Sequence, residues 1–310
     1  MRVFVAGASG AIGKRLVPAL VAAGHEVTGS TRKPANAKAL TAAGAMPVVL
    51  DGLDAVAVGE AVAKAEPDVI VHQMTAIPTS AGFRNFDKVF ATTNELRTKG
   101  LDHLMAAALA SGTGRVIAQS FTGWPNIRTG GPVKTEEDPL DPDPPANQRI
   151  SMAAIQHVER TVQGAPGVTG LALRYGMLYG PGTANEIAAM IRKRQFPLVG
   201  GGEGVWSFIH VEDAAQATAA AVERGPAGVY NIVDDEPAPV SVWLPAVAKA
   251  IGAKPPMRVP TWVGRIGAGE VGVSMMTRVR GSSNAKAKRE LGWQPTWPTW
   301  RQGFARGLGD

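Results

Sequence analysis

The chain of 310 residues contains no cysteine and no long apolar run. Without cysteine there is no disulfide, no thiolate metal site and no cysteine nucleophile. No run approaches the roughly 18 consecutive apolar residues that indicate a transmembrane helix. Met1 and Arg2 lead directly into an apolar segment without the pattern of a signal peptide. We therefore expect a cytoplasmic protein without a membrane partner.

The sequence also lacks any long block of charge of one sign. Its 32 basic and 26 acidic residues give a formal net charge of +6, and the surplus is scattered. Such a surplus is typical of an ordinary protein surface, with attraction for an anionic ligand as the alternative. No zinc-finger, RNA-recognition or basic-arm pattern accompanies it, so nucleic acid is not an expected partner. The 5 histidines are dispersed without an H-x-x-x-H pattern, so we predict no metal site.

Short β-rich runs alternate with longer helical segments through the first half of the chain. The β-rich runs cover residues 3–7, 26–32, 47–51, 68–74 and 115–120. Those that are continuously apolar are typical of strands that are buried on both faces of a parallel sheet. The pattern predicts an α/β fold with a Rossmann-type, doubly wound parallel sheet.

The chain changes character at residues 123–148, where glycine, proline and acidic residues predominate. That composition predicts a long loop, and such loops are commonly lids or binding loops. The strand and helix pattern resumes after it. We predict an NAD(P)-binding Rossmann domain over residues 1–178, to which residues 205–235 return, and a smaller C-terminal substrate-binding lobe over residues 179–310.

The segment GASGAIG follows the first expected strand and opens the first expected helix. Its first glycine permits a tight turn, the second lets a pyrophosphate approach the backbone, and the third lets helix and strand pack closely. The helix N-terminus then offers unpaired N–H groups to the phosphates. A glycine-rich connection without a ligand is the alternative. The predicted cofactor contacts of this turn are Gly7, Ser9, Gly10, Ala11, Ile12 and Gly13.

The end of the second expected strand bears on the choice of dinucleotide. An acidic side chain there would bind the ribose 2′-OH of NAD, but the segment VTGSTRK has Arg32 and Lys33 instead. Arg32 can hold a 2′-phosphate through charge-assisted hydrogen bonds. We therefore predict NADP as the cofactor, with NAD as the less favoured alternative. The alternative that involves no ligand is a basic loop exposed to solvent.

Several further segments carry a combined pattern: LDGLD, VIVHQMTAI, LRYGMLYGPG, FIHVEDAAQA and NAKAKRELGWQPTWPTWRQGF. With GASGAIG they resemble the extended short-chain dehydrogenases/reductases, the NAD(P)-dependent epimerase/dehydratase family, over nearly the whole chain. The resemblance implies the Rossmann-type fold and an NAD(P)-dependent oxidoreductase or epimerase. Because open α/β sheets bind ligands at the carboxyl ends of their strands, Gln119 and Ser120 are expected to face the nicotinamide. The resemblance further implies cofactor contacts from Asp51, Gly52, Thr75, Ala76 and Asn94.

One pattern of that family is missing. Members that move a hydride use a Tyr-x-x-x-Lys pair, in which the phenol exchanges a proton with the substrate and the lysine lowers the phenol's pKa and holds the nicotinamide ribose. Counting back from Glu159 puts Ser151 and Ile155 at these positions, on an expected helix at 149–162. None of the 3 tyrosines has a lysine four residues later. The chain is thus similar to atypical members that keep the cofactor fold without the usual acid/base pair.

Three residues are candidates for replacement chemistry: Thr122, Ser151 and Tyr175. Thr122 follows the fifth strand, beside Phe121 at the position that best matches the family's Ser or Thr. Tyr175 ends the sixth strand, and its matching family position lies near the nicotinamide, but a core-packed tyrosine is the alternative. Ser151 can either hydrogen-bond a substrate oxygen or cap the start of its helix.

Other polar and aromatic residues have weaker claims to a role in the site. His210 and Asp213 invite a catalytic pair, but the segment that they resemble braces the two lobes, so we expect a structural role. Four residues stand where the second lobe would close over a substrate, and core packing and an apolar pocket are equally compatible with them. They are Trp206, Trp262, Met275 and Met276.

The sequence as a whole predicts an NADP-dependent oxidoreductase, or an epimerase/dehydratase-like enzyme, acting on a small organic substrate that is anionic or apolar. Reduction of a conjugated alkene or an imine needs less help from a protein acid than reduction of a ketone does. Two alternatives remain: an NmrA-like binding protein that senses the nicotinamide pool, and a redox-neutral enzyme with bound NADP. In relatives the helices near 94–111 and 149–163 often pair, so a homodimer is a further expectation.

Overall fold

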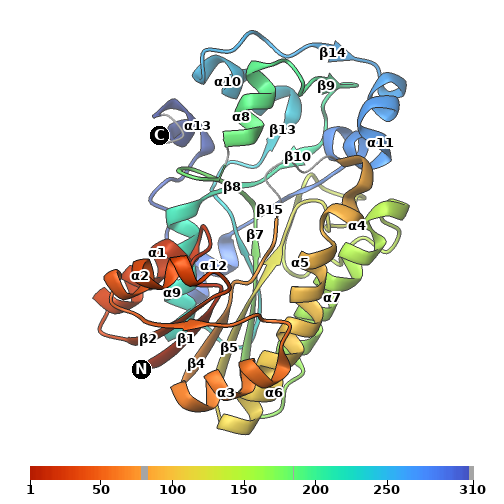
Figure 1. Cartoon of the computed structure of the whole chain (residues 1–310). Helices are drawn as coiled ribbons and strands as arrows, with labels where there is room; N and C mark the ends of the chain where they lie inside the picture. Colours follow the sequence, from red (N-terminus) through yellow and green to blue (C-terminus); the bar gives the residue numbers. More distant parts are fainter. Residues whose placement is uncertain (78–82, 184, 307–310) are drawn as a thin grey trace.

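The structure, a computed structural model, describes residues 1–77, 83–183 and 185–306. In this part of the chain a parallel seven-stranded sheet has the order β12-β7-β5-β4-β1-β2-β3 (Figure 1). The chain winds outward from β1 in both directions, which confirms the predicted doubly wound Rossmann-type sheet. The strands are β1 (Arg2–Ala6), β2 (Glu26–Thr31), β3 (Met46–Val49), β4 (Val69–His72), β5 (Arg115–Phe121), β7 (Thr169–Tyr175) and β12 (Gly228–Ile232).

The central strands are apolar on both sides because helices cover both faces of the sheet. Val3 and Val5 of β1 pack in one core, and Phe4 between them packs in the core on the opposite face. All three side chains are at most 1% exposed. One face carries α1 (Gly13–Ala22), α2 (Ala37–Ala42), α9 (Val211–Glu223) and α12 (Ala285–Leu291), and the other carries α3 (Ala55–Ala65), α6 (Leu101–Ser111) and α7 (Arg149–Gln163) (Figure 1).

The helical segment before β5 is irregular. It runs through η2 (Phe83–Asn85), α4 (Phe86–Val89) and α5 (Ala91–Glu95), and then makes a π-helical turn, η3 (Leu96–Gly100), before α6. π-helical turns are rare and are frequent at functional sites. The turn lies against α7, and Arg97 within it is only 4% exposed. The irregular turn therefore directs a charged side chain into the protein.

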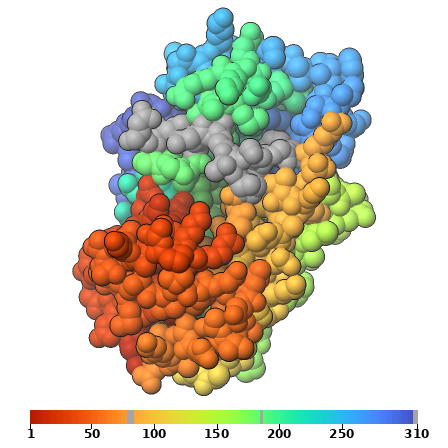
Figure 2. Space-filling model, in the orientation of Figure 1, coloured from red at the N-terminus to blue at the C-terminus, as the bar shows by residue number. Residues whose placement is uncertain are grey.

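The second lobe, green and blue at the top of Figures 1 and 2, is built around aromatic side chains. The ring centroids of Trp206 and Trp243 are 4.9 Å apart, and those of Phe208 and Trp243 are 5.3 Å apart. Such rings bury a large apolar area in a small lobe. Its elements are β8 (Met177–Tyr179), α8 (Asn185–Arg192), β9 (Leu198–Val199), β10 (Val205–Trp206), β11 (Phe208–His210), β13 (Ala238–Pro239), α10 (Val240–Ala250), β14 (Arg258–Val259), α11 (Thr261–Thr277) and α13 (Trp300–Ala305).

The two parts of the chain are interleaved. β11 pairs in parallel with β8, α9 packs on α1, and β12 completes the edge of the large sheet. α12 lies against β12 and α9, so residues 285–291, which fall within the predicted substrate lobe, pack on the sheet. His210 and Asp213 both contact the C-terminal segment of the chain. The His210 ring stacks on Trp297, with ring centroids 4.5 Å apart, and the Asp213 carboxylate accepts hydrogen bonds from the backbone N–H groups of Thr296 and Trp297 at 2.9 and 2.8 Å.

The loop at 123–148 is anchored to the second lobe. Within it β6 (Val133–Lys134) pairs in parallel with β15 (Gly281–Ser282), and a short 3-10 turn, η4 (Ala146–Gln148), leads into α7. The Asn126 side chain donates to the carbonyl of Arg280 at 3.1 Å and to Ser282 Oγ at 2.9 Å. These bonds hold the first part of the loop over the carboxyl end of β5.

Candidate active site

The glycine turn after β1 has a backbone that only glycine fits at two positions. Gly7 has φ of +86°, and a Cβ there would lie 2.8 Å from the Gln73 backbone. A Cβ at Gly13 would lie 2.4 Å from the Ala8 carbonyl oxygen. At Gly10, by contrast, the one close atom is the Gly7 carbonyl oxygen, at 3.3 Å. The fold thus requires glycine at positions 7 and 13, and Gly10 leaves room for a ligand.

The same turn presents backbone N–H groups. The first hydrogen bonds of α1 are donated by Lys14 to the Gly10 carbonyl and by Leu16 to the Ile12 carbonyl, at 3.0 and 2.9 Å. The amides of residues 11–13 therefore precede the first turn of hydrogen bonds and can bind an anion, together with the positive end of the helix dipole.

The carboxyl end of β2 borders this turn. Ser9 Oγ lies 2.9 Å from Thr31 Oγ1, and the Gly7 N–H donates to Ser30 Oγ at 3.2 Å. Arg32 is exposed and has no hydrogen bond or ion pair with any residue that the structure describes. A free guanidinium beside the anion-binding turn can hold a second phosphate.

The other expected cofactor contacts lie along the ends of β3 and β4. Asp51 is exposed, and its Oδ1 accepts from the Leu53 N–H at 3.1 Å. Gly52 packs against Met74, two residues after β4, because a Cβ there would lie 2.3 Å from Met74 Sδ. Thr75 is exposed, and the N–H of Ala76 donates to Thr93 Oγ1 at 3.0 Å. Asp51 and Thr75 are thus accessible to a ligand.

The start of α7 contains no free acid or base. Ser151 is fully buried, and its Oγ donates to Asp87 Oδ1 at 2.6 Å and accepts from Asn94 Nδ2 at 3.0 Å. The Asp87 carboxylate also accepts from the N–H groups of Ile150 and Ser151 at 3.1 and 2.8 Å. This geometry favours the helix-start role of Ser151 over its predicted catalytic role. Ile155 is fully buried in the core of the second lobe.

Tyr175 is sealed in the core. Its hydroxyl accepts from Gln73 Nε2 at 2.7 Å and lies 2.7 Å from Thr218 Oγ1, which itself donates to the Ala214 carbonyl. Burial raises the pKa of Tyr175 to about 12. A phenol that holds its proton this tightly and is 3% exposed fits the core-packed alternative better than the predicted general acid.

Ser120 faces α7 and joins a buried ion pair. Its Oγ donates to Glu159 Oε1 at 2.9 Å, and the Arg174 guanidinium binds the same carboxylate through two hydrogen bonds of 2.7 Å. Ser120, a predicted cofactor contact, is only 1% exposed, and its hydroxyl is occupied by the hydrogen bond to Glu159. Gln119 contacts Arg97, a residue that was not predicted, through a 3.4 Å hydrogen bond.

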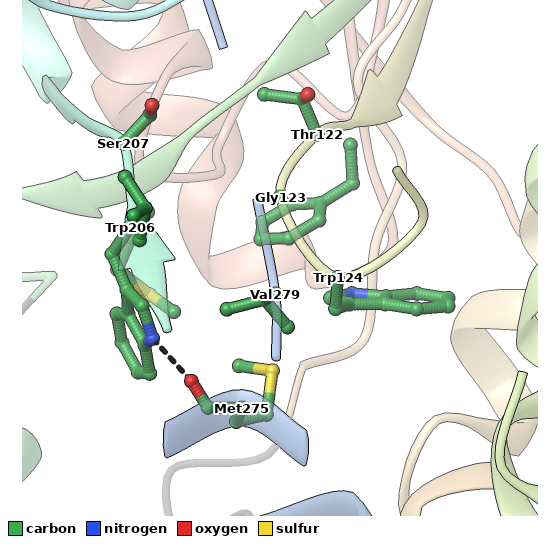
Figure 3. A pocket seen from close by; sticks show the side chains of 10 residues that line it. Thr122, Gly123, Trp124, Trp206, Ser207, Met275 and Val279 are labelled. Carbon is green, nitrogen blue, oxygen red and sulfur yellow. Dashed lines mark hydrogen bonds between the residues drawn. The ribbon is translucent and has the colours of Figure 1, made fainter. Parts of the chain in front are cut away.

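Thr122 lies at the wall of an apolar pocket between the two lobes (Figure 3). Its Oγ1 donates to Asn126 Oδ1 at 3.1 Å and lies 2.5 Å from Ser282 Oγ. The Trp206 ring is fixed by a 2.8 Å hydrogen bond from Nε1 to the Met275 carbonyl (Figure 3). The pocket is lined by Phe121, Thr122, Gly123, Trp124, Met177, Val205, Trp206, Ser207, Met275 and Val279.

The four residues expected where the second lobe would close over a substrate therefore occupy different environments. Trp206 and Met275 line the pocket, whereas Met276 is 4% exposed within the aromatic core. Trp262 is 65% exposed on α11, so it forms neither core nor pocket. Phe121 and Trp124 were not predicted as pocket residues, although Phe121 ends the central strand β5 and Trp124 follows it by three residues, at the carboxyl edge where ligands bind.

The described residues contain no group of three or more His, Cys, Asp or Glu side chains arranged to hold a metal ion. None of their helices has both the length and the apolar character needed to cross a membrane.

Comparison with known proteins places this site in a family. The model of the NAD dependent epimerase/dehydratase family matches residues 3–233. A Streptomyces protein named 3-diazoavenalumate denitrifying reductase is 42% identical over 313 residues, which cover 99% of this chain and 100% of that protein. A Stigmatella aurantiaca protein named 4-hydroxy-2-methyl-3-oxo-4-farnesyl-3,4-dihydroquinoline-1-oxide ketoreductase is 30% identical over 262 residues, 82% of this chain and 74% of that one.

Solved structures show the same fold. UDP-glucose 4-epimerase from Thermotoga maritima, solved with UDP-glucose, has a TM-score of 0.77 at 20% identity, covering 99% of this chain and 97% of its own. A human epimerase family protein solved with NADPH has a TM-score of 0.73 at 19% identity, with 99% and 98% covered. The chain belongs to the NAD-dependent epimerase/dehydratase family, as its segments predict. It is an enzyme of the short-chain dehydrogenase/reductase type.

Proposed function

We propose that this enzyme is an NADP-dependent reductase that acts on an electrophilic, conjugated aromatic substrate without a proton donor from the protein. The observation that carries the proposal is the state of the acid/base positions. The Ser151 hydroxyl donates a hydrogen bond to Asp87, Ile155 is apolar, and Tyr175 is buried with a raised pKa. A reaction in this site therefore has to proceed without the usual acid.

Reductive removal of nitrogen from an aryl diazonium group meets that requirement. Bound NADPH would supply the hydride. In such a step a new C–H bond forms, the C–N bond breaks, its electron pair leaves with N₂, and no proton is consumed. The name of the Streptomyces relative, a diazo-compound denitrifying reductase, describes a reaction of this kind. The 42% identity over the whole chain supports the same reaction class here.

The pocket beside Thr122 is the proposed place of an aromatic substrate, but its volume is only about 20 Å³, so it would have to widen to admit one. Its walls are aromatic: the ring centroids of Phe121 and Trp124 are 6.3 Å apart with an angle of 28° between the ring planes, and Trp206 stands opposite Trp124 (Figure 3). Flat aromatic walls favour a flat aromatic ligand. The pocket follows directly on β5, so a substrate there would adjoin the carboxyl edge of the sheet, where the cofactor is expected.

The residues around the glycine turn fit NADP. The amides of residues 11–13 can bind the pyrophosphate, and Gly10 leaves the space for it. Arg32, free and exposed at the end of β2, would hold the 2′-phosphate. Asp51 and Thr75 are accessible for the adenine and the adjoining part of the dinucleotide.

The test is turnover with NADPH and a substrate panel of aryl diazonium salts, enones, imines and ketones. We expect diazonium-dependent consumption of NADPH above the rate without protein, and transfer of deuterium from 4-deuterated NADPH to the carbon that carried nitrogen. The Gly10→Val variant, which keeps the pocket but blocks the pyrophosphate space, is the matched control. Consumption equal to that of the control for every compound would refute the reductase, and tight binding of both cofactor forms without turnover would support a sensor.

A further inference from the structure

Arg97 is a buried cation with no acidic partner in the part of the chain that the structure describes. It is 4% exposed, and its hydrogen bond to a described residue runs from Nη2 to Gln119 Oε1 over a long 3.4 Å. Its Nε is buried without an acceptor, and Nη1 has none among the residues that the structure describes. Burial lowers the pKa of Arg97 to about 10, and no carboxylate offsets the shift. The group is therefore still charged near pH 7.

Such a group is costly for a folded protein. A buried charge that lacks a partner destabilises the fold, and replacement of a buried charge by an apolar side chain is often neutral or stabilising. The buried Arg174, on the same side of the sheet, is satisfied by two hydrogen bonds to Glu159. Arg174 thus has an acidic partner, whereas Arg97 has, among the described residues, only the long bond to Gln119 and an Nε without an acceptor. Binding of a ligand is one explanation for such an unsatisfied buried cation.

Three other buried side chains around Arg97 also have unused polar atoms. Asn94 stands one helical turn before Arg97, and its Oδ1 has no donor. Gln119 has an unpaired Nε2, and His72, whose pKa burial lowers to about 4, has an unpaired Nδ1. The set contains both donors and acceptors. A bare carboxylate or phosphate could accept from Arg97 but could not donate to the Asn94 oxygen, whereas hydroxyl groups, which donate and accept, match the mixed set.

The position of this cluster specifies which hydroxyl groups could reach it. His72 is the last residue of β4, and the next residue, Gln73, abuts the glycine turn at Gly7. Gln119 of β5 is two residues before Phe121, which lines the aromatic pocket. The cluster therefore lies between the expected pyrophosphate site and the expected substrate site. In a dinucleotide the nicotinamide ribose occupies that interval.

We propose that Arg97, with Asn94 and Gln119, binds the hydroxyl groups of the nicotinamide ribose and supplies the positive charge that Ile155 cannot. The inference rests on the proposed use of NADPH by this chain. The helix that carries the charge differs from the one that the family pattern implies: Arg97 lies on the π-helical turn η3, whereas Ile155 lies on α7. The π-helical turn is the local feature that lets a long cationic side chain enter the sheet edge here.

The experiment compares wild type with Arg97→Met and Arg97→Lys for binding of three probes by calorimetry. NADPH contains both riboses, 2′-phospho-ADP-ribose lacks only the nicotinamide, and adenosine 2′,5′-bisphosphate lacks the second ribose. We expect Arg97→Met to weaken NADPH and 2′-phospho-ADP-ribose by about 10- to 100-fold, the loss typical of hydrogen bonds to a charged group, and to leave adenosine 2′,5′-bisphosphate unchanged. Arg97→Lys should restore part of the loss.

Thermal unfolding without ligand separates this role from a structural one. Because Arg97 is unpaired in the free protein, Arg97→Met should leave Tm unchanged or raise it. Equal affinity of wild type and Arg97→Met for NADPH would overturn the proposal, as would a lowered Tm or a variant that does not fold. A wild-type protein that binds none of the probes would instead overturn the proposed function itself.

Discussion

The two ends of the expected cofactor cleft differ in how they depend on the rest of the chain. At the glycine turn the proposed ligand site would be made of backbone, shaped by a positive φ at Gly7 and a close approach at Gly13. At α7 the side chains depend on distant residues, since Ser151 is held by Asp87 and Asn94. A site made of backbone follows from a short motif, whereas a site made of side chains depends on which segments meet there.

The sharpest way to test this contrast is to restore the missing lysine. Ile155→Lys would bury an ammonium group in an apolar core, because Ile155 is fully buried. We expect it to reduce the free energy of unfolding by at least about 3 kcal/mol, measured by urea denaturation. Ile150→Lys on the same helix is the control, since Ile150 is 64% exposed, and it should cost less than about 0.5 kcal/mol. Equal effects of the two variants would show that α7 tolerates the family's lysine.

The glycine turn should respond in ligand binding without loss of stability. Gly10→Val adds a side chain whose Cβ would lie 3.3 Å from the Gly7 carbonyl oxygen, a tight contact that a shift of a few tenths of an ångström in the turn would relieve. We expect NADPH affinity to fall by about 100-fold or more, measured by calorimetry, with Tm nearly unchanged. Gly114→Val, at a position with nothing within 4 Å of a Cβ, should change neither quantity. Unchanged NADPH affinity in Gly10→Val would show that the pyrophosphate does not bind at this turn.

Arg32 should distinguish the two dinucleotides. Arg32→Ala removes a free guanidinium at the end of β2, and we expect it to weaken NADPH by about 10-fold or more while leaving NADH unchanged. Lys38→Ala, which removes another exposed cation from α2, should affect both cofactors little. If Arg32→Ala weakened the binding of NADPH and NADH alike, Arg32 would not contact the 2′-phosphate. Its positive charge would instead attract both dinucleotides equally.

Tyr175 should have the smallest effect. Tyr175→Phe removes hydrogen bonds to Gln73 and Thr218, so we expect a loss of about 1 kcal/mol in stability and a kcat within about twofold of wild type. Because its pKa of about 12 in the folded protein exceeds the usual value of about 10, its contribution to stability is complete below pH 10 and is lost as the pH rises from about 10 to about 12. A large fall in kcat would contradict the core-packed role and support Tyr175 as the proton donor.

The sequence anticipated most of the fold and part of the site. The order of apolar runs and the glycine motif predicted the doubly wound sheet, because strand burial and turn geometry are encoded in neighbouring residues. The absence of Tyr-x-x-x-Lys could also be established by counting. Ser120 and Tyr175 stood at the expected strand ends, but whether a residue there faces a ligand or a helix depends on the strand's register against its neighbours. In the structure Ser120 faces Glu159 and Tyr175 faces Thr218.

What the sequence alone determined, then, is the parallel sheet, the glycine turn after its first strand and the loss of the family's acid/base pair, since each depends on residue types at fixed short spacings. Only the tertiary structure showed that Arg97 is buried without a carboxylate, and that Phe121 and Trp124 meet Trp206 across a pocket. A lone arginine in a helical segment reads as a surface residue, because pairing and burial depend on side chains from remote parts of the chain. Those contacts form only when the helices pack on the sheet.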